Sequence, residues 1–379
     1  MSEYQVIGTI IAAFAAAGVL AYILTPFVKR FAHKVGAIDV PKDGRRMHKV
    51  PIPRMGGLAI FLAFLCAMLI FADFNEQLLS ILLGAAIIVV LGIFDDIMAL
   101  GAKLKFAVQI VAAAIPVCAG GLKIEMFTNL NPFSDVPYFN LGIFAIPVTI
   151  IWIVGITNAV NLIDGLDGLA VGVSSIASLT MLAVGLLTND LAVAVTMASL
   201  TGACIGFMPY NLNPAKIFMG DTGSTFLGFV LATMSIQGMF KFYAVISFAV
   251  PFLILGLPIF DTAFAITRRV LSGRSPMSPD RGHVHHRLMD MGFNQKQSVA
   301  ILYAISGTLG LAAVVLTSRG EIKAMMLVLA VIIAIAAGAQ ILMSVDKHMN
   351  AHGERHHVAS QKENAPQSEG KDKETNEED

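Results

Sequence analysis

Eleven long apolar runs constrain this chain more than any other feature of its sequence. They lie at about 6–28, 56–72, 78–94, 104–120, 141–157, 168–188, 190–208, 222–238, 242–267, 298–317 and 322–344. A helix that crosses the hydrocarbon core of a bilayer needs about 20 mostly apolar residues. Helices are favoured there because they satisfy their own backbone polar groups. The runs therefore predict an all-α polytopic membrane protein with about 11 transmembrane helices.

The composition agrees with a membrane protein. Of the 379 residues, 56% are hydrophobic and 14% are charged, whereas soluble domains usually contain about 25% charged residues. The 26 basic and 26 acidic residues give a formal net charge of zero, so we expect no nucleic-acid partner that binds through bulk positive charge. The three cysteines lie inside apolar runs without a CxxC motif, which argues against disulfides and structural zinc.

The distribution of lysine and arginine predicts the orientation of the chain. Basic residues are concentrated in the loops 29–55 and 268–297, which eleven helices place on the same side. The loops on the other side, at 73–77, 121–140 and 189–190, contain only Lys123. The positive-inside rule makes the basic side cytoplasmic, with the N-terminus outside and the C-terminus inside.

The chain divides into a membrane domain at 1–345 and a polar tail at 346–379. We expect the tail to be disordered, because it is rich in charged residues and poor in apolar ones. The external loop 121–140 contains two prolines between short apolar stretches, which predicts a small hairpin or an amphipathic segment.

Five aspartates lie at the ends of the apolar runs. Two end the third run, two follow the fifth and one precedes the eighth; they are Asp95, Asp96, Asp164, Asp167 and Asp221. The predicted topology puts all five at the cytoplasmic face, together with the loop that contains His283, His285, His286 and Arg287. Charged residues are expelled from lipid in any case, but paired acids without basic neighbours at a membrane border indicate a functional site.

This set of residues is typical of metal-assisted phosphoryl chemistry. Carboxylates held close together cannot all ionise without a cation, and Mg²⁺ commonly takes one or two carboxylates together with substrate phosphates and waters. Arginine and histidine beside the acids suit phosphate contacts. A zinc site at the histidines is a weaker reading, because His285 and His286 are adjacent in the sequence and no cysteine is near.

An ion-coupled transporter is the alternative from another class, since intramembrane acids also mark ion paths. Pro251 and Pro258 interrupt the ninth run, as in a broken transport helix. The acids, however, lie at helix ends rather than near helix centres.

Five blocks of sequence resemble the polyprenyl-phosphate N-acetylhexosamine-1-phosphate transferase family over residues 5–345. In order, the blocks are Pro-Arg-Met-Gly-Gly at 53–57, Asp-Asp at 95–96, Asn-Leu-Ile-Asp-Gly-Leu-Asp-Gly at 161–168, Phe-Met-Gly-Asp-Thr-Gly-Ser at 218–224 and His-Val-His-His-Arg at 283–287. The last block looks like that of the WecA/TagO branch. Val284 separates it from the MraY branch, which usually has three consecutive histidines and uses UDP-N-acetylmuramoyl-pentapeptide.

The resemblance implies transfer of N-acetylglucosamine-1-phosphate from UDP-N-acetylglucosamine to undecaprenyl phosphate, with release of UMP. This would be the first membrane step of a cell-envelope glycan pathway, such as that of teichoic acid or O-antigen. It also implies Mg²⁺, with Mn²⁺ as a substitute, a bacterial inner or plasma membrane location, an active site on the cytoplasmic face, and a homodimer. MraY-type transfer is the alternative within the family.

The resemblance also assigns roles to residues. Asp95 and Asp96 match catalytic residues, and Asp221 and Asp96 match magnesium ligands. The residues that match substrate-binding positions are Asn161, Asp164, Gly165, Leu166, Asp167, Asn211, Phe218, His283, His285, His286, Arg287 and Lys103. Lys103 and Lys105 follow the acidic pair, and each either contacts phosphate or is an ordinary lysine of a cytoplasmic loop. Direct attack by the lipid phosphate, with Asp95 as a base, and double displacement through an aspartyl-phosphate both remain open.

Overall fold

The computed structural model of the protein describes residues 3–41, 50–128, 138–239, 245–273, 275 and 282–319. The last expected run, at 322–344, and the tail at 346–379 lie outside the described residues. The helices are α1 Glu3–Val35, α2 Gly57–Phe71, α3 Glu76–Met98, α4 Ala102–Cys118, α5 Ala145–Leu162, α6 Leu169–Leu187, α7 Leu191–Asn211, α8 Gly220–Met239, α9 Val245–Ile254, α10 Gly256–Leu271, α11 Val284–Asp290 and α12 Gln295–Arg319.

The prediction of an all-helical membrane protein is confirmed at this level. Among the described residues, six helices are long and apolar enough to cross a bilayer, namely α1, α3, α5 with the 3-10 turn η1 (Gly142–Phe144) before it, α6, α7 and α12. The helix α2 is apolar but shorter. The first eight runs and the tenth each correspond to one helix.

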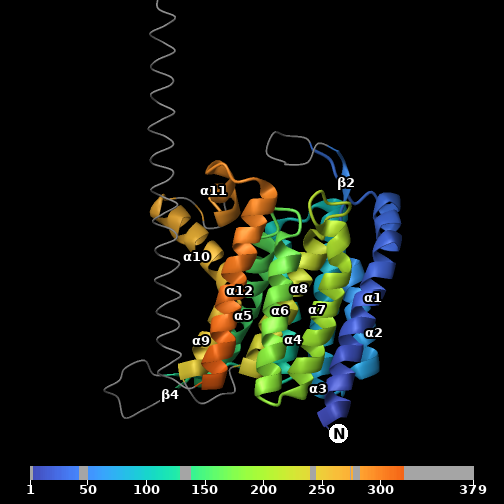
Figure 1. The fold of residues 1–379 in the computed structure, drawn as a ribbon. Coiled ribbons are helices and arrows are strands. Elements are labelled where there is room, and N and C mark those ends of the chain that lie inside the picture. Colours follow the sequence, from blue (N-terminus) through green and yellow to red (C-terminus); the bar gives the residue numbers. More distant parts are fainter. Residues whose placement is uncertain are drawn as a thin grey trace, which may run out of the picture. The chain divides into compact units, whose positions relative to one another are not determined.

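The ninth run, at 242–267, is not one continuous helix. It breaks at Leu255, between α9 and α10. Pro258 lies in the first turn of α10, where a missing backbone N–H removes no intrahelical hydrogen bond. The break therefore lets α10 leave the direction of α9 (Figure 1).

The helix α8 forms the centre of the bundle. It packs mainly against α3 and α5 and also contacts α2 and α6. Its side chains are buried from Thr222 to Gly238, as expected for a helix that is not amphipathic. Hydroxyl groups along it, such as that of Thr233, donate to backbone carbonyls of the preceding turn, so these buried hydroxyls are satisfied.

Two short antiparallel hairpins lie at opposite ends of the helices. One joins β1 (Ile38–Asp39) to β2 (Ile52–Pro53), and the other joins β3 (Met126–Thr128) to β4 (Tyr138–Asn140). The second hairpin confirms the prediction made for the loop 121–140. Figure 1 places β4 and the start of α1 at one end of the bundle, and β2 and α11 at the other.

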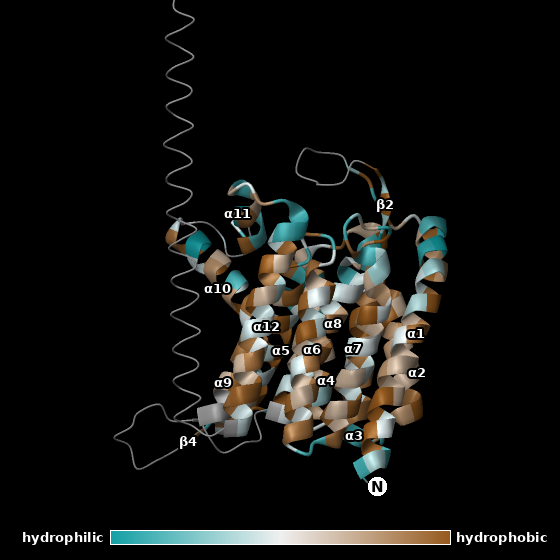
Figure 2. Ribbon diagram, in the orientation of Figure 1, coloured by the Kyte–Doolittle hydropathy of each residue, from teal (hydrophilic) through white to brown (hydrophobic). Residues whose placement is uncertain are grey.

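Polar residues gather at the end of the bundle that carries α11 and β2, which we call the site end. Figure 2 shows hydrophobic residues along the lengths of the helices and hydrophilic residues at α11 and at the helix ends beside it. The connections between α5 and α6 and between α7 and α8 lie at the same end. The fold thus brings together segments that are far apart in the sequence.

Candidate active site

A cavity of about 530 Å³ opens at the site end. Nine residues that the sequence predicted for the site line it: Asn161, Asp164, Gly165, Leu166, Asp167, Asn211, Phe218, Asp221 and His286. They come from the last turn of α5, the α5–α6 connection, the end of α7, the α7–α8 connection, the start of α8 and α11. The cavity, which is called the pocket below, thus brings together acids from the α5–α6 connection and from the start of α8.

Lys105 connects two of the acids at the base of the site. Its ammonium nitrogen lies 2.9 Å from Oδ2 of Asp95 and 2.9 Å from Oδ2 of Asp221. Asp95 also accepts a hydrogen bond from the backbone N–H of Leu100 at 2.7 Å. One positive charge thus holds together an aspartate from the end of α3 and an aspartate from the start of α8, which would otherwise repel each other.

Asp96 lies behind the wall of the pocket and holds the N-terminus of α8. Its Oδ1 accepts from the backbone N–H of Asp221 at 3.0 Å. Its Oδ2 accepts from the backbone N–H of Thr222 at 3.1 Å and from the Thr222 hydroxyl at 2.7 Å. A carboxylate at this position satisfies N–H groups that the helix leaves unpaired and interacts favourably with its dipole. Asp96 is buried and is not among the residues that line the pocket.

A glycine contact fixes α8 against the segment that precedes α2. The backbone N–H groups of Gly56 and Gly57 donate to the carbonyls of Phe218 and Met219, each at 2.9 Å. A Cβ atom on Gly57 would lie 2.0 Å from Cα of Gly223, so no larger residue fits without a backbone shift. This close approach explains why two glycines end the first of the five blocks.

The same contact brings Arg54 into the pocket. Its guanidinium lies 3.9 Å from Asp39, and both residues line the pocket with Asp221. Arg54 belongs to the first of the five blocks, but the sequence alone assigns it no role. An arginine beside a cluster of carboxylates is suited to a bidentate contact with a phosphate.

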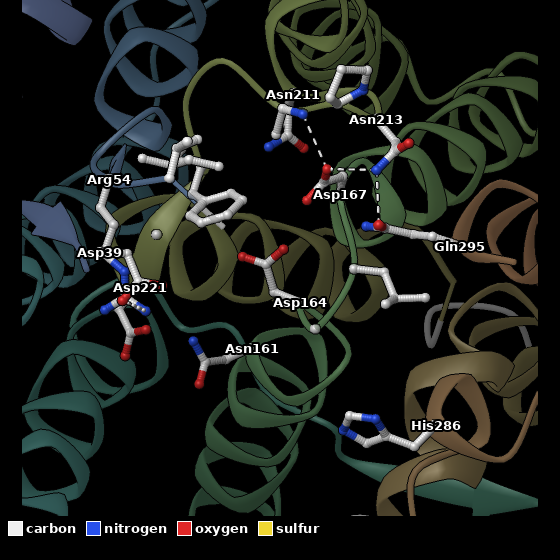
Figure 3. A pocket seen from close by; sticks show the side chains of 18 residues that line it. Asp39, Arg54, Asn161, Asp164, Asp167, Asn211, Asn213, Asp221, His286 and Gln295 are labelled. Carbon is white, nitrogen blue, oxygen red and sulfur yellow. Dashed lines mark hydrogen bonds and ion pairs between the residues drawn. The ribbon is translucent and has the colours of Figure 1, made fainter. Parts of the chain in front are cut away.

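A network of side-chain amides surrounds Asp167. Oδ2 of Asp167 accepts from Nδ2 of Asn213 at 2.9 Å and from the backbone N–H of Ala215 at 3.0 Å. Asn213 donates in addition to Gln295, at the start of α12, at 2.8 Å. Figure 3 shows this chain of three side chains along one wall of the pocket. Sequence reasoning missed Asn213 and Gln295, because neither belongs to a recognised block.

Asp164 projects into the pocket between its two sides. Figure 3 shows Asp221 and Arg54 on one side of it and His286 on the other. Burial away from water raises the pKa of Asp164 to about 7, and the negative charges of Asp221 and Asp96 add to this shift. The positive charge of Arg54 opposes it. Asp164 therefore changes its charge near neutral pH.

The histidine block places one imidazole in the pocket and buries the other two. His286 lines the pocket, whereas the side chains of His283 and His285 are buried behind it. Burial, together with the nearby His286, lowers the pKa of His285 to about 4, so this imidazole is neutral at physiological pH. Among the described residues, no group of three or more His, Cys, Asp or Glu side chains is arranged to hold a metal, so the structure gives the zinc reading no support.

Two predicted residues lie away from the pocket. Arg287 is exposed on α11, and Lys103 is exposed on the first turn of α4. Neither belongs to the lining of the pocket. Of the two lysines that follow the acidic pair, it is Lys105 that contacts the acids.

The fold and the site define a polytopic helical membrane protein with an acidic site suited to phosphate chemistry. Residues 78–239 match Glycosyl transferase family 4. The chain is 44% identical to a probable undecaprenyl-phosphate N-acetylglucosaminyl 1-phosphate transferase of Bacillus subtilis, over 82% of this chain and 85% of that protein. The chain belongs to this family of membrane transferases, and the resemblance predicted from its five blocks is confirmed.

The chain is also similar to two further transferases. A decaprenyl-phosphate N-acetylglucosaminephosphotransferase of Mycolicibacterium smegmatis is 33% identical over 84% of this chain and 85% of its own length. A phospho-N-acetylmuramoyl-pentapeptide-transferase of Staphylococcus aureus strain MW2 is 32% identical over 77% of this chain and 94% of its own length. Because these relatives are transferases, family membership decides against the transporter alternative.

Proposed function

We propose that the protein transfers N-acetylglucosamine-1-phosphate from UDP-N-acetylglucosamine to undecaprenyl phosphate and releases UMP. The observation that carries this proposal is the pocket lined by Asp221, Asp164 and His286, in a chain 44% identical to the Bacillus transferase. The reaction supplies a lipid-linked sugar for a cell-envelope glycan, such as teichoic acid or O-antigen.

Different residues of the pocket bind different parts of UDP-N-acetylglucosamine in this proposal. We assign the nucleotide to the wall formed by Asp167, Asn211 and Phe218, where the Phe218 ring offers a face on which uracil stacks. The diphosphate lies near Asp221 and Arg54. The sugar lies toward His286, on the other side of Asp164 (Figure 3).

The donor set at Asp221 fits a magnesium ion shared with the substrate. Asp221 lines the pocket and uses Oδ2 to bind Lys105. Mg²⁺ rarely has an all-protein cage and usually takes one or two carboxylates with substrate phosphates and waters. We therefore assign Asp221 as the protein ligand. Mg²⁺, or Mn²⁺ in its place, supplies charge stabilisation of the leaving phosphate when it is bound.

For Asp96, the resemblance predicts a second metal ligand and a catalytic group. Both of its oxygens instead accept hydrogen bonds from the first turn of α8. We propose that Asp96 acts by holding the turn that carries Asp221. Asp95 holds the ammonium group of Lys105 in the same way. The role of Asp95 as a general base is therefore a secondary proposal.

In the direct mechanism, an oxygen of the lipid phosphate attacks the phosphorus that carries the sugar. A P–O bond to the lipid phosphate forms, and the P–O bond to UMP breaks with its electron pair leaving on UMP. The lipid phosphate is largely ionised near neutral pH, so no base is obligatory. Double displacement through an aspartyl-phosphate is the alternative. A phosphorylated aspartate trapped from UDP-N-acetylglucosamine without lipid would overturn direct attack.

We also propose the finer membrane arrangement. It consists of about 11 transmembrane helices within 1–345, the N-terminus outside, the tail at 346–379 in the cytoplasm, and the site end facing the cytoplasm of a bacterial cell. Support comes from the basic residues of the loops 29–55 and 268–297. A homodimer is proposed from the family resemblance alone.

The substrate is tested with purified protein in nanodiscs. The protein receives undecaprenyl phosphate, Mg²⁺ and one of three donors: UDP-N-acetylglucosamine, UDP-N-acetylgalactosamine or UDP-N-acetylmuramoyl-pentapeptide. We expect UMP release and a lipid-linked product with the first donor. Product formed only with the pentapeptide donor would assign the protein to the MraY branch. The absence of UMP release with every donor would refute the transferase assignment.

The metal assignment is tested by Asp221→Asn, with Asp290→Asn as a control, because Asp290 is an exposed acid on α11. We expect Asp221→Asn to lose metal-dependent turnover by about 10²-fold or more and to keep its thermal unfolding temperature. Asp290→Asn should match the wild type in both. Near-normal turnover of Asp221→Asn would contradict the assignment.

A further inference from the structure

Asp261 is a buried acid in α10 that neither the blocks nor the pocket include. Its side chain is 4% exposed, and it lies in a run that the sequence marked as apolar enough for a membrane. A carboxylate removed from water requires compensating hydrogen bonds or charges. The contacts that supply them indicate what the residue does.

Both oxygens of Asp261 bind the start of the histidine block. Oδ2 lies 2.8 Å from Nδ1 of His283, and Oδ1 accepts from the backbone N–H of Val284 at 2.8 Å. With Asp261 ionised, Nδ1 of His283 carries the proton and donates it to Oδ2 of Asp261. His283 makes no side-chain cap to α11, so Asp261 satisfies the first N–H of α11 from a different helix.

A second contact from α10 holds the same segment. Nη1 of Arg268 donates to the carbonyl of Gly282 at 3.0 Å. Asp261 and Arg268 are seven residues apart, so they lie on the same face of the helix. A Cβ atom on Gly282 would lie 2.0 Å from the Arg268 guanidinium, which shows how closely the segment 282–284 is held against α10.

The imidazoles form a series from Asp261 to the pocket. The rings of His283 and His285 are stacked, with centroids 5.8 Å apart and planes 9° apart. The rings of His285 and His286 have centroids 4.2 Å apart. His285 is confined by Gly165, where a Cβ atom would lie 2.4 Å from its Nε2. Because these rings are packed, the position of His283 constrains the position of His286, which lines the pocket.

We propose that Asp261 is a positioning residue for the sugar-nucleotide: it fixes His283 and the start of α11, and through them the orientation of His286 in the pocket. Asp261 is not among the residues that line the pocket, so it acts through the histidines and not on the substrate. The inference rests on the proposed function, because it takes UDP-N-acetylglucosamine as the ligand of the pocket.

Asp261→Asn is the informative substitution. An asparagine keeps an oxygen that accepts from the N–H of Val284, so α11 keeps its cap. Its amide group donates to Nδ1 of His283, which reverses the tautomer of the imidazole. We expect the affinity for UDP-N-acetylglucosamine, measured by calorimetry, to fall by about tenfold to a hundredfold, as for a displaced substrate-positioning group. The KM for undecaprenyl phosphate and the unfolding temperature should change little.

A double-mutant cycle separates positioning from a general structural role. If Asp261 acts through His283, Asp261→Asn combined with His283→Gln should bind UDP-N-acetylglucosamine no more weakly than His283→Gln alone. Asp290→Asn, which removes an exposed acid from α11, should bind like the wild type. Additive losses in the double variant would overturn the inference, and so would an Asp261→Asn variant that binds as tightly as the wild type. In either case, binding of UDP-N-acetylglucosamine by the wild-type protein would still support the proposed function. A wild-type protein that does not bind UDP-N-acetylglucosamine would overturn both.

Discussion

Lys105 places one positive charge between the carboxylates of Asp95 and Asp221, at 2.9 Å from each. The side chain is half-buried, so water screens these contacts less than it screens a surface ion pair. The pair of contacts has two effects. It lowers the repulsion between the two acids, and it leaves a cation beside the ligand proposed for the metal and the diphosphate.

We expect Lys105→Met to lower kcat by about 10²-fold or more, because it removes the charge that pairs with Asp221, the proposed metal ligand. Lys103→Met is the matched control, since Lys103 is exposed two residues earlier on the same helix. It should retain near-normal kcat. Steady-state UMP release in nanodiscs measures both. The opposite ranking of the two variants would transfer the role to Lys103.

The burial of His285 predicts how the stability of the protein depends on pH. The imidazole has an ordinary pKa of 6.5 and a pKa of about 4 in the folded protein. Between these values the unfolded chain binds a proton that the folded protein does not, so stability falls as the pH falls from about 6.5 to 4. The full contribution is on the order of 3 kcal/mol.

Unfolding temperatures measured between pH 7.5 and pH 4 test this prediction. We expect His285→Gln to show a smaller decrease than the wild type over this range, whatever its stability at neutral pH. His33→Gln is the control, because His33 is exposed on α1, and it should follow the wild-type curve. A His285→Gln curve parallel to the wild type would show that His285 does not carry the pH dependence.

At the scale of helices, the first turn of α8 is the element on which the site depends. Asp96 caps this turn from α3, and Gly57 lets the segment before α2 approach it. Asp221 therefore occupies a position that two other elements define.

Asp96→Ala should unfold more easily by about 1–2 kcal/mol, the usual effect of losing a helix cap, and turnover per folded molecule should fall by at least about tenfold. Asp190→Ala is the matched control. Asp190 caps α7 through the N–H of Val193, at the end of the bundle opposite the site end. It should lose similar stability and keep its turnover. Rescue of Asp96→Ala by raised Mg²⁺ would instead make Asp96 a metal ligand.

At the scale of the whole molecule, the two ends of the bundle should face different compartments. In a cysteine-free background, we expect Asp73→Cys, in the exposed α2–α3 connection, to react in intact cells with a membrane-impermeant maleimide. Asp290→Cys, on α11 at the site end, should react only after the cells are opened. Labelling in the reverse pattern would invert the proposed topology.

The sequence allowed prediction of features that depend on local composition. Apolar runs indicate helices. Asp95 and Asp164 follow the third and fifth runs and Asp221 precedes the eighth, so the expectation that they lie at one end of the bundle followed from connectivity. The break at Leu255 and the number of membrane-spanning helices depend on packing, so the sequence alone predicts them less well.

Contacts between distant residues could not be predicted in the same way. Lys105 is 116 residues from Asp221, and nothing near either one indicates the pairing. Asn213 and Gln295 are ordinary loop and helix-start residues by sequence. Asp261 stands alone in an apolar run, where only the structure shows that His283 is its partner.

The start of α12 has a consequence for how the enzyme is made. Gln295 completes the amide wall of the pocket, and the Tyr303 hydroxyl donates to the carbonyl of Gly168, at the end of the α5–α6 connection. Ribosomes synthesise α12 after all the other elements that contribute to the pocket. A nascent chain that has inserted only as far as α11 already contains all five aspartates, but the amide wall of its pocket is incomplete. The pocket is therefore completed only late in the translation and insertion of the chain.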